Sequence, residues 1–201
     1  MMKSRVMRHS LALLSLFSLT LLPGVAQSDQ NTRYVSLKIG RSMPVDVSGS
    51  GVTLSFEDGY ALSGAVGIHL LSSVRLELEG SYRSFEFGKA RVGNVTVTPT
   101  GDIDYTTLMG NVYYDFRNDS PVTPYLLAGI GHTWASTRLR LGTAKIEASG
   151  DGMAYQAGLG LSIALGQDWN ADLEYRYFGV NNDDVDDFGN NEVMAGLRYA
   201  F

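Results

Sequence analysis

Residues 73–82 read SVRLELEGSY, and the alternation in this stretch decides the fold. Apolar and polar side chains follow each other one by one, with Val74, Leu76, Leu78 and Tyr82 set against Arg75, Glu77, Glu79 and Ser81. A period of two places all the apolar side chains on one face of a β-strand and all the charges on the other. The stretch therefore predicts a strand between an apolar and a polar environment.

The same alternation recurs along the chain and predicts eight strands of roughly ten residues each. They are expected near residues 35–40, 62–70, 74–82, 107–116, 124–134, 155–165, 169–178 and 192–201. The facing of the 124–134 strand stays open, because small or apolar residues occupy both of its faces.

The connections between these strands alternate in length. Short connections are expected at 71–72, 117–123 and 166–168. Long loops rich in Gly, Asn, Asp, Ser and Thr are expected near residues 44–59, 84–103, 136–152 and 179–190. Short turns at one end and long loops at the other are typical of an outer-membrane barrel, with turns in the periplasm and loops outside.

A soluble eight-stranded ligand carrier has the same periodicity with the opposite facing, so other features must separate the two folds. The chain finishes on a strand ending in Tyr199 and Phe201, which favours pairing with the first strand at a membrane interface. Aromatic residues also gather at the expected strand ends and predict an aromatic girdle: Tyr34, Tyr82, Tyr105, Phe116, Tyr125, Trp134, Trp169 and Tyr177. We therefore predict an all-β protein, an eight-stranded antiparallel up-and-down transmembrane β-barrel.

The polar face of the strands carries both signs of charge, which suits pairing inside a narrow lumen. The predicted lumen charge network comprises Lys38, Arg75, Glu77, Glu79, Arg83, Asp115, Asp172, Glu174, Arg176, Glu192 and Arg198. An eight-stranded interior has room for little beyond side chains, which favours a lumen packed shut. If gaps persist, they are expected beside Gly129, Gly131, Gly158 and Gly160.

The first residues predict export. Lys3, Arg5 and Arg8 precede an apolar run over residues 11–22, and small residues follow, which is the order of a secretory signal peptide. Cleavage is expected after Ala26 or Ser28, giving a signal peptide over residues 1–26 and a barrel domain over 30–201. Removal of the three cations leaves 13 basic against 21 acidic residues, a net charge of −8, which speaks against nucleic-acid binding.

Four stretches, NVYYDF, PYLLAGIG, YQAGLGLSIALG and EVMAGLRYAF, resemble the small eight-stranded outer-membrane β-barrel domain family. This family includes the transmembrane domain of outer-membrane protein A and the opacity-type surface proteins of Gram-negative bacteria. The resemblance implies recognition by the outer-membrane insertion machinery through Tyr199 and Phe201, contact with membrane lipid and lipopolysaccharide, and no cofactor. It implies no single shared activity.

Candidate chemical sites are few. Lipid A deacylases of this size carry a His and a Ser two residues apart, but Trp134 stands in the serine position after His132, and Ser136 lies four residues on. His132 is therefore expected at an interface beside Trp134, and His69 is expected to hydrogen-bond in the lumen. We predict no catalytic, cofactor or metal site.

The acidic stretch NNDDVDDFGNNE departs from the EF-hand pattern. Asp184, Asp186 and Gly189 fit the first, third and sixth positions, whereas Phe188 and Ala195 occupy the fifth and twelfth. A solvated acidic loop is the better interpretation.

These features predict a protein of the cell outer membrane with a structural or surface-interaction role rather than an enzyme. The alternative is a small diffusion channel for ions or small solutes, and lipid A modification ranks third.

Overall fold

The computed structural model describes residues 32–45, 47–49, 52–92, 95–97, 100–141, 144–182 and 185–201. The expected signal peptide lies outside these residues. No helix among them is long and apolar enough to cross a membrane.

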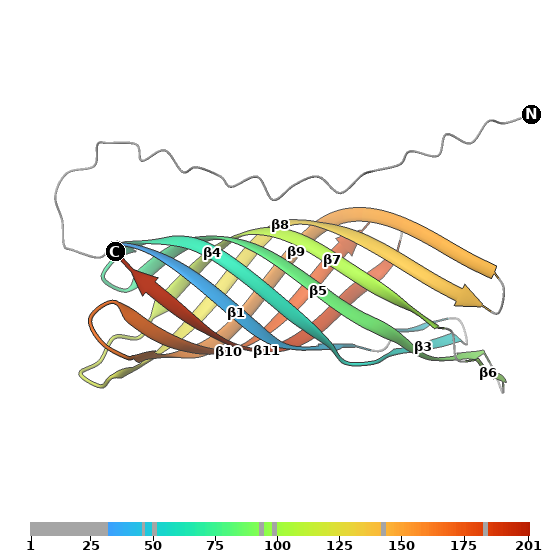
Figure 1. Ribbon diagram of the computed structural model, residues 1–201, viewed down its shortest axis with the longest axis horizontal. Helices are drawn as coiled ribbons and strands as arrows, with labels where there is room; N and C mark the ends of the chain where they lie inside the picture. The colour runs from blue at the N-terminus through green and yellow to red at the C-terminus, as the bar shows by residue number, and fades with distance from the viewer. Residues whose placement is uncertain are drawn as a thin grey trace, which may run out of the picture.

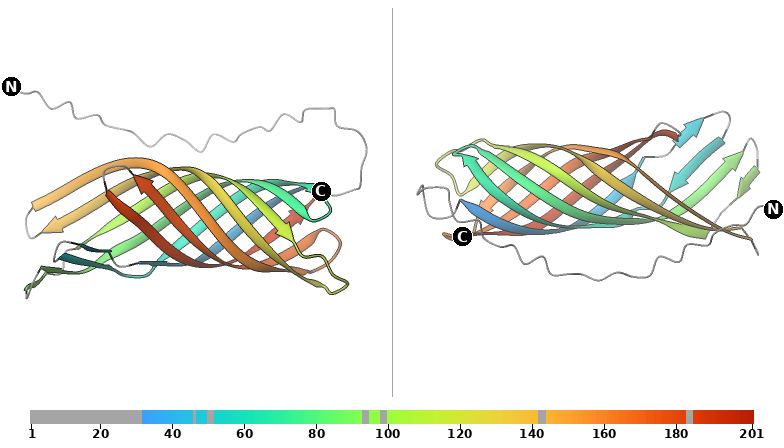
Figure 2. Two further views of the ribbon diagram at one scale, coloured as in Figure 1. Left: turned by 180° about the vertical axis from the view of Figure 1, so that it is seen from behind. Right: turned by 90° about the horizontal axis from the view of Figure 1, so that it is seen from above.

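Eight long strands form a closed antiparallel barrel (Figures 1 and 2). They are β1 (Arg33–Pro44), β4 (Gly59–Leu71), β5 (Val74–Val92), β7 (Thr100–Asp115), β8 (Val122–Leu141), β9 (Ala144–Ala164), β10 (Trp169–Asn182) and β11 (Val185–Ala200). Each long strand pairs with its neighbours in sequence, and β1 also pairs with β11, from Tyr34 opposite Ala200 to Pro44 opposite Asn190. This last pairing joins the two ends of the sheet, so the predicted fold class is confirmed.

The two ends of the barrel differ. At one end, called here the short-turn end, residues 72–73, 116–121 and 165–168 connect the strands. At the opposite end, called here the hairpin end, the strands continue as extensions of different heights (Figure 1). The short strands β2 (Val47–Gly49), β3 (Val52–Phe56) and β6 (Val95–Val97) form a small sheet there with the end of β5.

The four long connections were predicted as loops, but most of their residues form strands. Most of residues 84–103, 136–152 and 179–190 belong to paired strands, and the long strands contain 12 to 21 residues. The cause is physical: where a hairpin stands in water on both faces, its side chains need not alternate, so polar and small residues resemble a loop. The 44–59 connection likewise contains β2 and β3.

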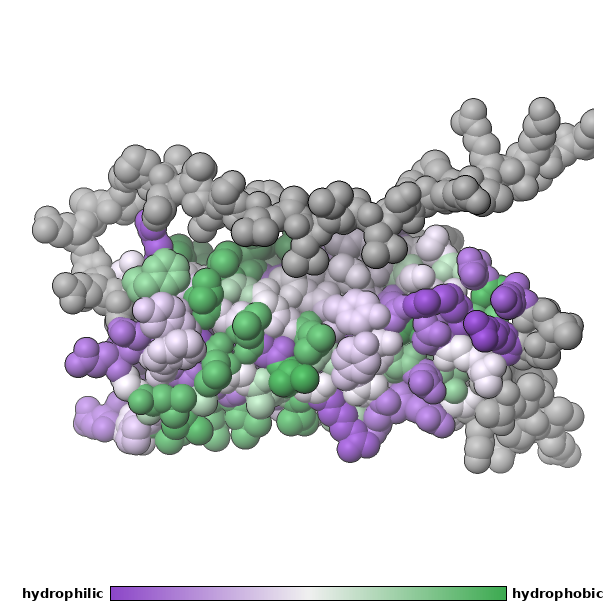
Figure 3. Space-filling view, in the orientation of Figure 1, coloured by the Kyte–Doolittle hydropathy of each residue, from purple (hydrophilic) through white to green (hydrophobic). Residues whose placement is uncertain are grey.

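The outer wall is apolar and the interior is polar. Leu37, Ile130 and Leu159 project outward and are 73%, 69% and 57% exposed. Figure 3 shows the resulting hydrophobic band between hydrophilic ends. In hydrocarbon each backbone N–H and C=O needs a partner within the protein, and a closed barrel supplies one for every strand. The wall is therefore built for contact with lipid.

The open question about residues 124–134 is settled by burial. Tyr125 and Leu127 are buried inside the barrel, whereas Leu126 and Ile130 are exposed on the wall. Alternation could not decide this, because apolar side chains lie on both faces of this part of β8.

Replacing Leu37 by arginine tests the lipid-facing wall. A charge at this position in β1 should lower the free energy of unfolding in lipid vesicles by roughly 2–4 kcal/mol. The measurement is a denaturant titration followed by the mobility shift between unheated and boiled protein, with Leu37→Ala as the uncharged control. Equal stability of Leu37→Arg and Leu37→Ala would contradict the assignment of this face.

Candidate functional site

The eleven charged residues of the predicted network lie inside the barrel. Each has at most 7% of its surface exposed: Lys38, Arg75, Glu77, Glu79, Arg83, Asp115, Asp172, Glu174, Arg176, Glu192 and Arg198. Burial of a charge costs free energy unless it is paired and hydrogen-bonded. The contacts among these residues therefore decide whether the interior is stable and whether it is open.

Arg176 is the centre of the network. Its Nη1 lies 3.0 Å from Glu79 Oε2 and 3.4 Å from Glu174 Oε1, and its Nε lies 2.6 Å from Glu192 Oε2. Glu192 also pairs with Arg83, whose Nε is 2.5 Å from Glu192 Oε1. These residues come from β5, β10 and β11, so the ion pairs cross the lumen as well as joining neighbouring strands.

The network continues through Lys38 and Tyr113. Lys38 Nζ lies 2.8 Å from Glu174 Oε2 and donates a hydrogen bond to Tyr113 Oη at 3.1 Å. Tyr113 Oη in turn donates to Glu77 Oε1 at 2.8 Å. Glu77 forms no ion pair with another described residue, and it accepts hydrogen bonds from neutral donors instead: Ser36, Asn111 and Tyr113.

A tyrosine cluster surrounds Arg75 toward the short-turn end. The Arg75 guanidinium donates two hydrogen bonds of 2.8 Å to Asp115. Its Cζ lies 4.3 Å from the ring centre of Tyr113, 5.2 Å from that of Tyr125 and 5.8 Å from that of Tyr34. Cation–π attraction therefore adds to the ion pair at this site.

The girdle prediction was wrong for Tyr34 and Tyr125. They are 1% and 2% exposed and point into the lumen, where Tyr125 Oη donates to Glu174 Oε2 at 3.0 Å. Glycines make room for both rings, because a Cβ at Gly67 would lie 2.1 Å from Tyr34 Cζ and one at Gly160 would lie 2.4 Å from Tyr125 Cζ. Position near a strand end could not separate these inward tyrosines from outward ones.

Arg198 and His69 also face the lumen near this end. Arg198 Nη2 lies 3.3 Å from Asp172 Oδ1 and donates to Ser162 Oγ at 2.6 Å. His69 packs edge-on against Tyr34, with 5.5 Å between ring centres. Its Nδ1 has no hydrogen-bond partner among the described residues, so the expected hydrogen bond is not seen at that atom.

An apolar cluster, called here the plug, lies in the lumen toward the hairpin end. Met109, Ala154, Phe178 and Val180 form a buried cluster against which Tyr105 packs. The plug meets the charge network directly, since Arg83 Cζ lies 3.9 Å from the ring centre of Phe178. Another ring extends the plug: Phe85 stacks on Tyr105 at 5.8 Å.

Tyr105 was also wrongly assigned to the girdle. Tyr105 lies four residues before Met109 in β7, so both side chains are on the inward face of the strand. There Tyr105 packs against the plug.

The glycines named as the places where any gaps would lie have close neighbours. A Cβ at Gly129 would lie 2.0 Å from Asn111 Oδ1, and one at Gly131 would lie 2.0 Å from the Leu108 carbonyl oxygen. One at Gly158 would lie 2.7 Å from Arg176 Cβ. A side chain at any of these positions would therefore require the neighbouring atoms to shift.

The remaining girdle residues are on the outer wall. Outward-facing members of the predicted set are Tyr82, Phe116, Trp134, Trp169 and Tyr177. Trp169 lies 4.9 Å from the Tyr199 ring centre, and Tyr199 stacks on Phe201 at 6.3 Å.

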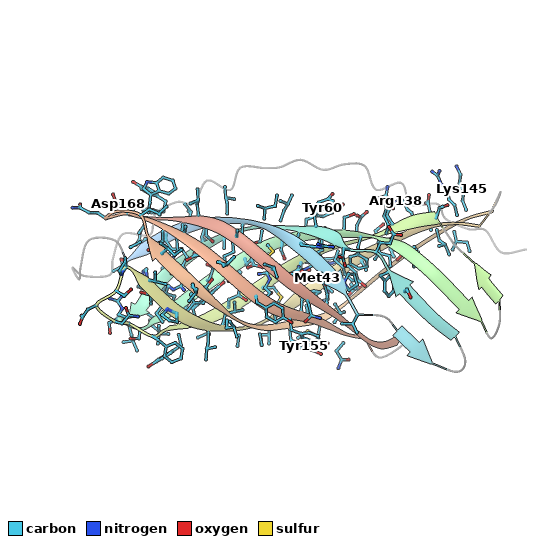
Figure 4. The ribbon with its side chains drawn as sticks, turned by 90° about the horizontal axis from the view of Figure 1, so that it is seen from below. Met43, Tyr60, Arg138, Lys145, Tyr155 and Asp168 are labelled. Atoms are coloured by element: carbon cyan, nitrogen blue, oxygen red, sulfur yellow. The ribbon has the colours of Figure 1, made fainter. Side chains whose placement is uncertain are left out.

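The sequence analysis missed Tyr60, Tyr114 and Tyr155 on the same wall. Figure 4 shows Tyr60 and Tyr155 between Asp168 at the short-turn end and Lys145 at the hairpin end. The signal that could have found them is their place on the apolar face of their strands.

The candidate chemical residues do not assemble a reactive site. The His132 ring is 4.9 Å from Trp134, and its Nε2 lies 3.1 Å from Asp151 Oδ2. Within the described residues no group of three His, Cys, Asp or Glu side chains could hold a metal ion. Asp184 lies outside the described residues, and the side chains of Asp186 and Phe188 are not described either.

A polar rim stands on the outer face beyond the apolar wall. Tyr82 Oη donates to Asp104 Oδ1 at 2.6 Å, and Arg138 bridges Asp104 and Asp102, with its Nη2 2.9 Å from Asp102 Oδ2. Burial acts to raise the pKa of Asp104, but the hydrogen bonds from Tyr82, Ser84 and Arg138 outweigh it and lower that pKa. The stabilisation from ionised Asp104 is therefore lost only as the pH falls through this lowered pKa.

Comparisons with known proteins agree with this geometry. Residues 10–201 match the family model for the outer membrane protein beta-barrel domain. Major surface antigen 4 of Anaplasma marginale is 31% identical over 169 residues, which cover 70% of this chain and 60% of the relative. Outer membrane protein PagN of Salmonella typhimurium is 27% identical over 161 residues, covering 64% and 65%. The chain thus spans less than two thirds of these relatives.

The same fold occurs in a solved structure. The crystal structure of Neisserial surface protein A has a TM-score of 0.64 and 20% sequence identity. The match covers 87% of this chain and 100% of that one.

Replacing Glu79 by glutamine tests the central ion pairs. The change leaves the buried Arg176 with less negative charge around it and should cost roughly 3–5 kcal/mol of unfolding free energy. Glu77→Gln should cost only about 1 kcal/mol, because an amide oxygen can still accept the Tyr113 hydrogen bond.

Denaturant titration in lipid vesicles measures both effects, and Glu86→Gln, an exposed position on the same strand, is the control. A Glu77 variant less stable than the Glu79 variant would contradict the central role of Arg176.

Proposed function

Because the chain belongs to the outer membrane protein beta-barrel domain family, we propose that it is a closed outer-membrane scaffold that displays its hairpins at the cell surface. The observation that carries this proposal is the set of side chains that cross the lumen. Ion pairs around Arg176 occupy the middle, and the plug around Phe178 lies between them and the hairpin end. On this proposal solutes do not pass through the barrel, and the protein acts at the surface beyond the membrane.

The names of the relatives support a surface role. One is a surface antigen and another is a surface protein. This chain shares the barrel with them, and its hairpin end offers exposed side chains such as Lys145 and Ser149. A catalytic role has no comparable support, because Trp134 occupies the position where a serine beside His132 would be needed.

A diffusion channel is the second candidate function. Arg176 Nη2 and Gln156 Oε1 are buried without a hydrogen-bond partner among the described residues. Such atoms are places where internal water can bind. Conduction would further require the ion pairs of Arg176 to separate and the Phe178 plug to move.

Single-channel recording in a planar lipid bilayer separates the two functions. We expect folded protein, verified by the mobility shift of the unheated sample, to give no discrete conductance steps, because side chains fill the lumen. Reproducible steps from the wild-type chain would establish an open path and replace the scaffold proposal with the channel.

Cysteine labelling tests which end faces outside. The chain contains no cysteine, so a single introduced thiol reports one position. We expect Ser149→Cys, on the β8–β9 hairpin, to react on intact cells with a membrane-impermeant maleimide, and Ser120→Cys, at the short-turn end, to react only after lysis. The reverse pattern would show that the hairpins lie in the periplasm.

A further inference from the structure

A cleft opens where β5 and β7 separate at the hairpin end. The two strands pair as far as Glu86 opposite Asp102. Beyond that pair, β5 continues with β3 and β6, whereas β7 continues with β8 (Figure 1). The cleft at this fork has a volume of about 480 Å³. A volume of this size is within the range of small-molecule sites in proteins.

Opposite charges line the two sides of this cleft, called here the fork cleft. On the β5 side are Glu57 and Glu86, whose backbones are joined by a 3.0 Å hydrogen bond from the Glu57 N–H to the Glu86 carbonyl oxygen. On the β8 side are Arg138 and Arg140. Asp102 of β7 lies between the two sides, in register with Glu86 and with Arg138. The fork cleft is therefore acidic on one side and basic on the other.

Three of these charges form no ion pair with another described residue: Glu57, Glu86 and Arg140. Asp102 differs from them, because Arg138 Nη2 lies 2.9 Å from its Oδ2. Glu86 thus stands opposite Asp102 without a cation of its own, and like charges directly opposite each other destabilise a strand pair. A bound cation beside Glu57 and Glu86 would relieve this repulsion, and a bound anion would complement Arg140.

The spacing of the charges suits a small zwitterion. Glu86 and Arg140 belong to strands two places apart, and two strand spacings amount to about 10 Å. Both side chains line the same cleft, so one short molecule can meet both. Thr100, in register opposite Arg140, adds a hydroxyl group to the basic side. Arginine can donate two parallel hydrogen bonds to a phosphate, which favours phosphate as the anionic group.

The fork cleft adjoins the polar rim, because Arg138 and Asp102 belong to both. The rim also contains Tyr82, a residue of the aromatic girdle, and girdle residues lie at the level of lipid head groups. A ligand with an ammonium and a phosphate is therefore available at this height as a lipid head group, as well as in solution.

We propose that the fork cleft binds a phosphoethanolamine group, with its ammonium beside Glu57 and Glu86 and its phosphate beside Arg140 and Thr100. This inference goes beyond the proposed scaffold role. It does not depend on whether the barrel conducts, because the rim and its cleft are on the outer face of the strands.

An NMR titration of the folded, isotope-labelled full chain in an uncharged sugar detergent tests the site. The probes are phosphoethanolamine, ethanolamine and inorganic phosphate, each added alone. We expect phosphoethanolamine to shift the amide signals of Glu86, Asp102 and Arg140, with half saturation on the order of 1–10 mM because exposed ion pairs are weak. Ethanolamine and phosphate should each bind roughly two- to fivefold more weakly, since each meets one side only.

Charge variants separate the two ends of the ligand. Glu86→Gln should weaken the binding of phosphoethanolamine and ethanolamine roughly two- to fivefold and leave phosphate binding unchanged. Arg140→Gln should weaken the binding of phosphoethanolamine and phosphate and leave ethanolamine binding unchanged. The matched controls are Asp119→Asn and Arg117→Gln at the short-turn end, both exposed, which should change none of the three affinities. The mobility shift of unheated protein verifies that each variant folds.

Nanodiscs distinguish the two sources of the group. If a lipid head group occupies the cleft, soluble phosphoethanolamine should bind severalfold more weakly in nanodiscs of phosphatidylethanolamine than in nanodiscs of phosphatidylglycerol. Equal binding in the two would identify a soluble ligand. The inference would be overturned by unchanged amide signals at Glu86, Asp102 and Arg140, or by a Glu86→Gln variant that binds ethanolamine as tightly as the wild-type chain.

Discussion

The hydrocarbon core of the membrane offers no hydrogen-bond partner to the backbone, and the rest of this structure depends on that constraint. A sheet in that environment cannot end on a free edge, so β1 must pair with β11, and it does so from Tyr34 to Pro44. Closure of the barrel gives each strand an outer face and an inner face, which lie in different environments. The wall must be apolar because it meets lipid, and the interior receives every side chain that the wall excludes.

The interior of the barrel differs from the core of a soluble protein because it is mainly polar. It contains several charges, and each needs compensation because water is largely excluded. Arg176 is compensated by carboxylates from β5, β10 and β11, so the ion pairs fix those strands relative to each other across the lumen. Glu77, which lacks a cationic partner among the described residues, is held by neutral donors instead. These contacts support the proposed closed lumen, because a gap between the strands would separate a charge from its partner.

Sequence periodicity could predict the strands and the faces of most charged residues, since a charge on the lipid side is too costly to be tolerated. It was less informative for tyrosine, which is accepted in either environment. Tyr34 and Tyr125 face inward because Gly67 and Gly160 leave room for their rings, and that fit depends on cross-strand register, which one sequence does not reveal. The hairpin extensions were missed for a related reason: water on both faces removes the alternation that identifies a strand.

The need for backbone hydrogen bonds within the membrane also explains why the strands can differ in length above it. Within the membrane each of the eight strands has two neighbours, but above it water can satisfy a free backbone edge, and the strands need not end at one height. Among the described residues, the pairing of β10 with β9 runs as far as Met153, whereas the pairing of β8 with β9 runs as far as Ala144. Strands that end at different heights, which the hydrocarbon core would not allow a few residues lower, are therefore permitted here.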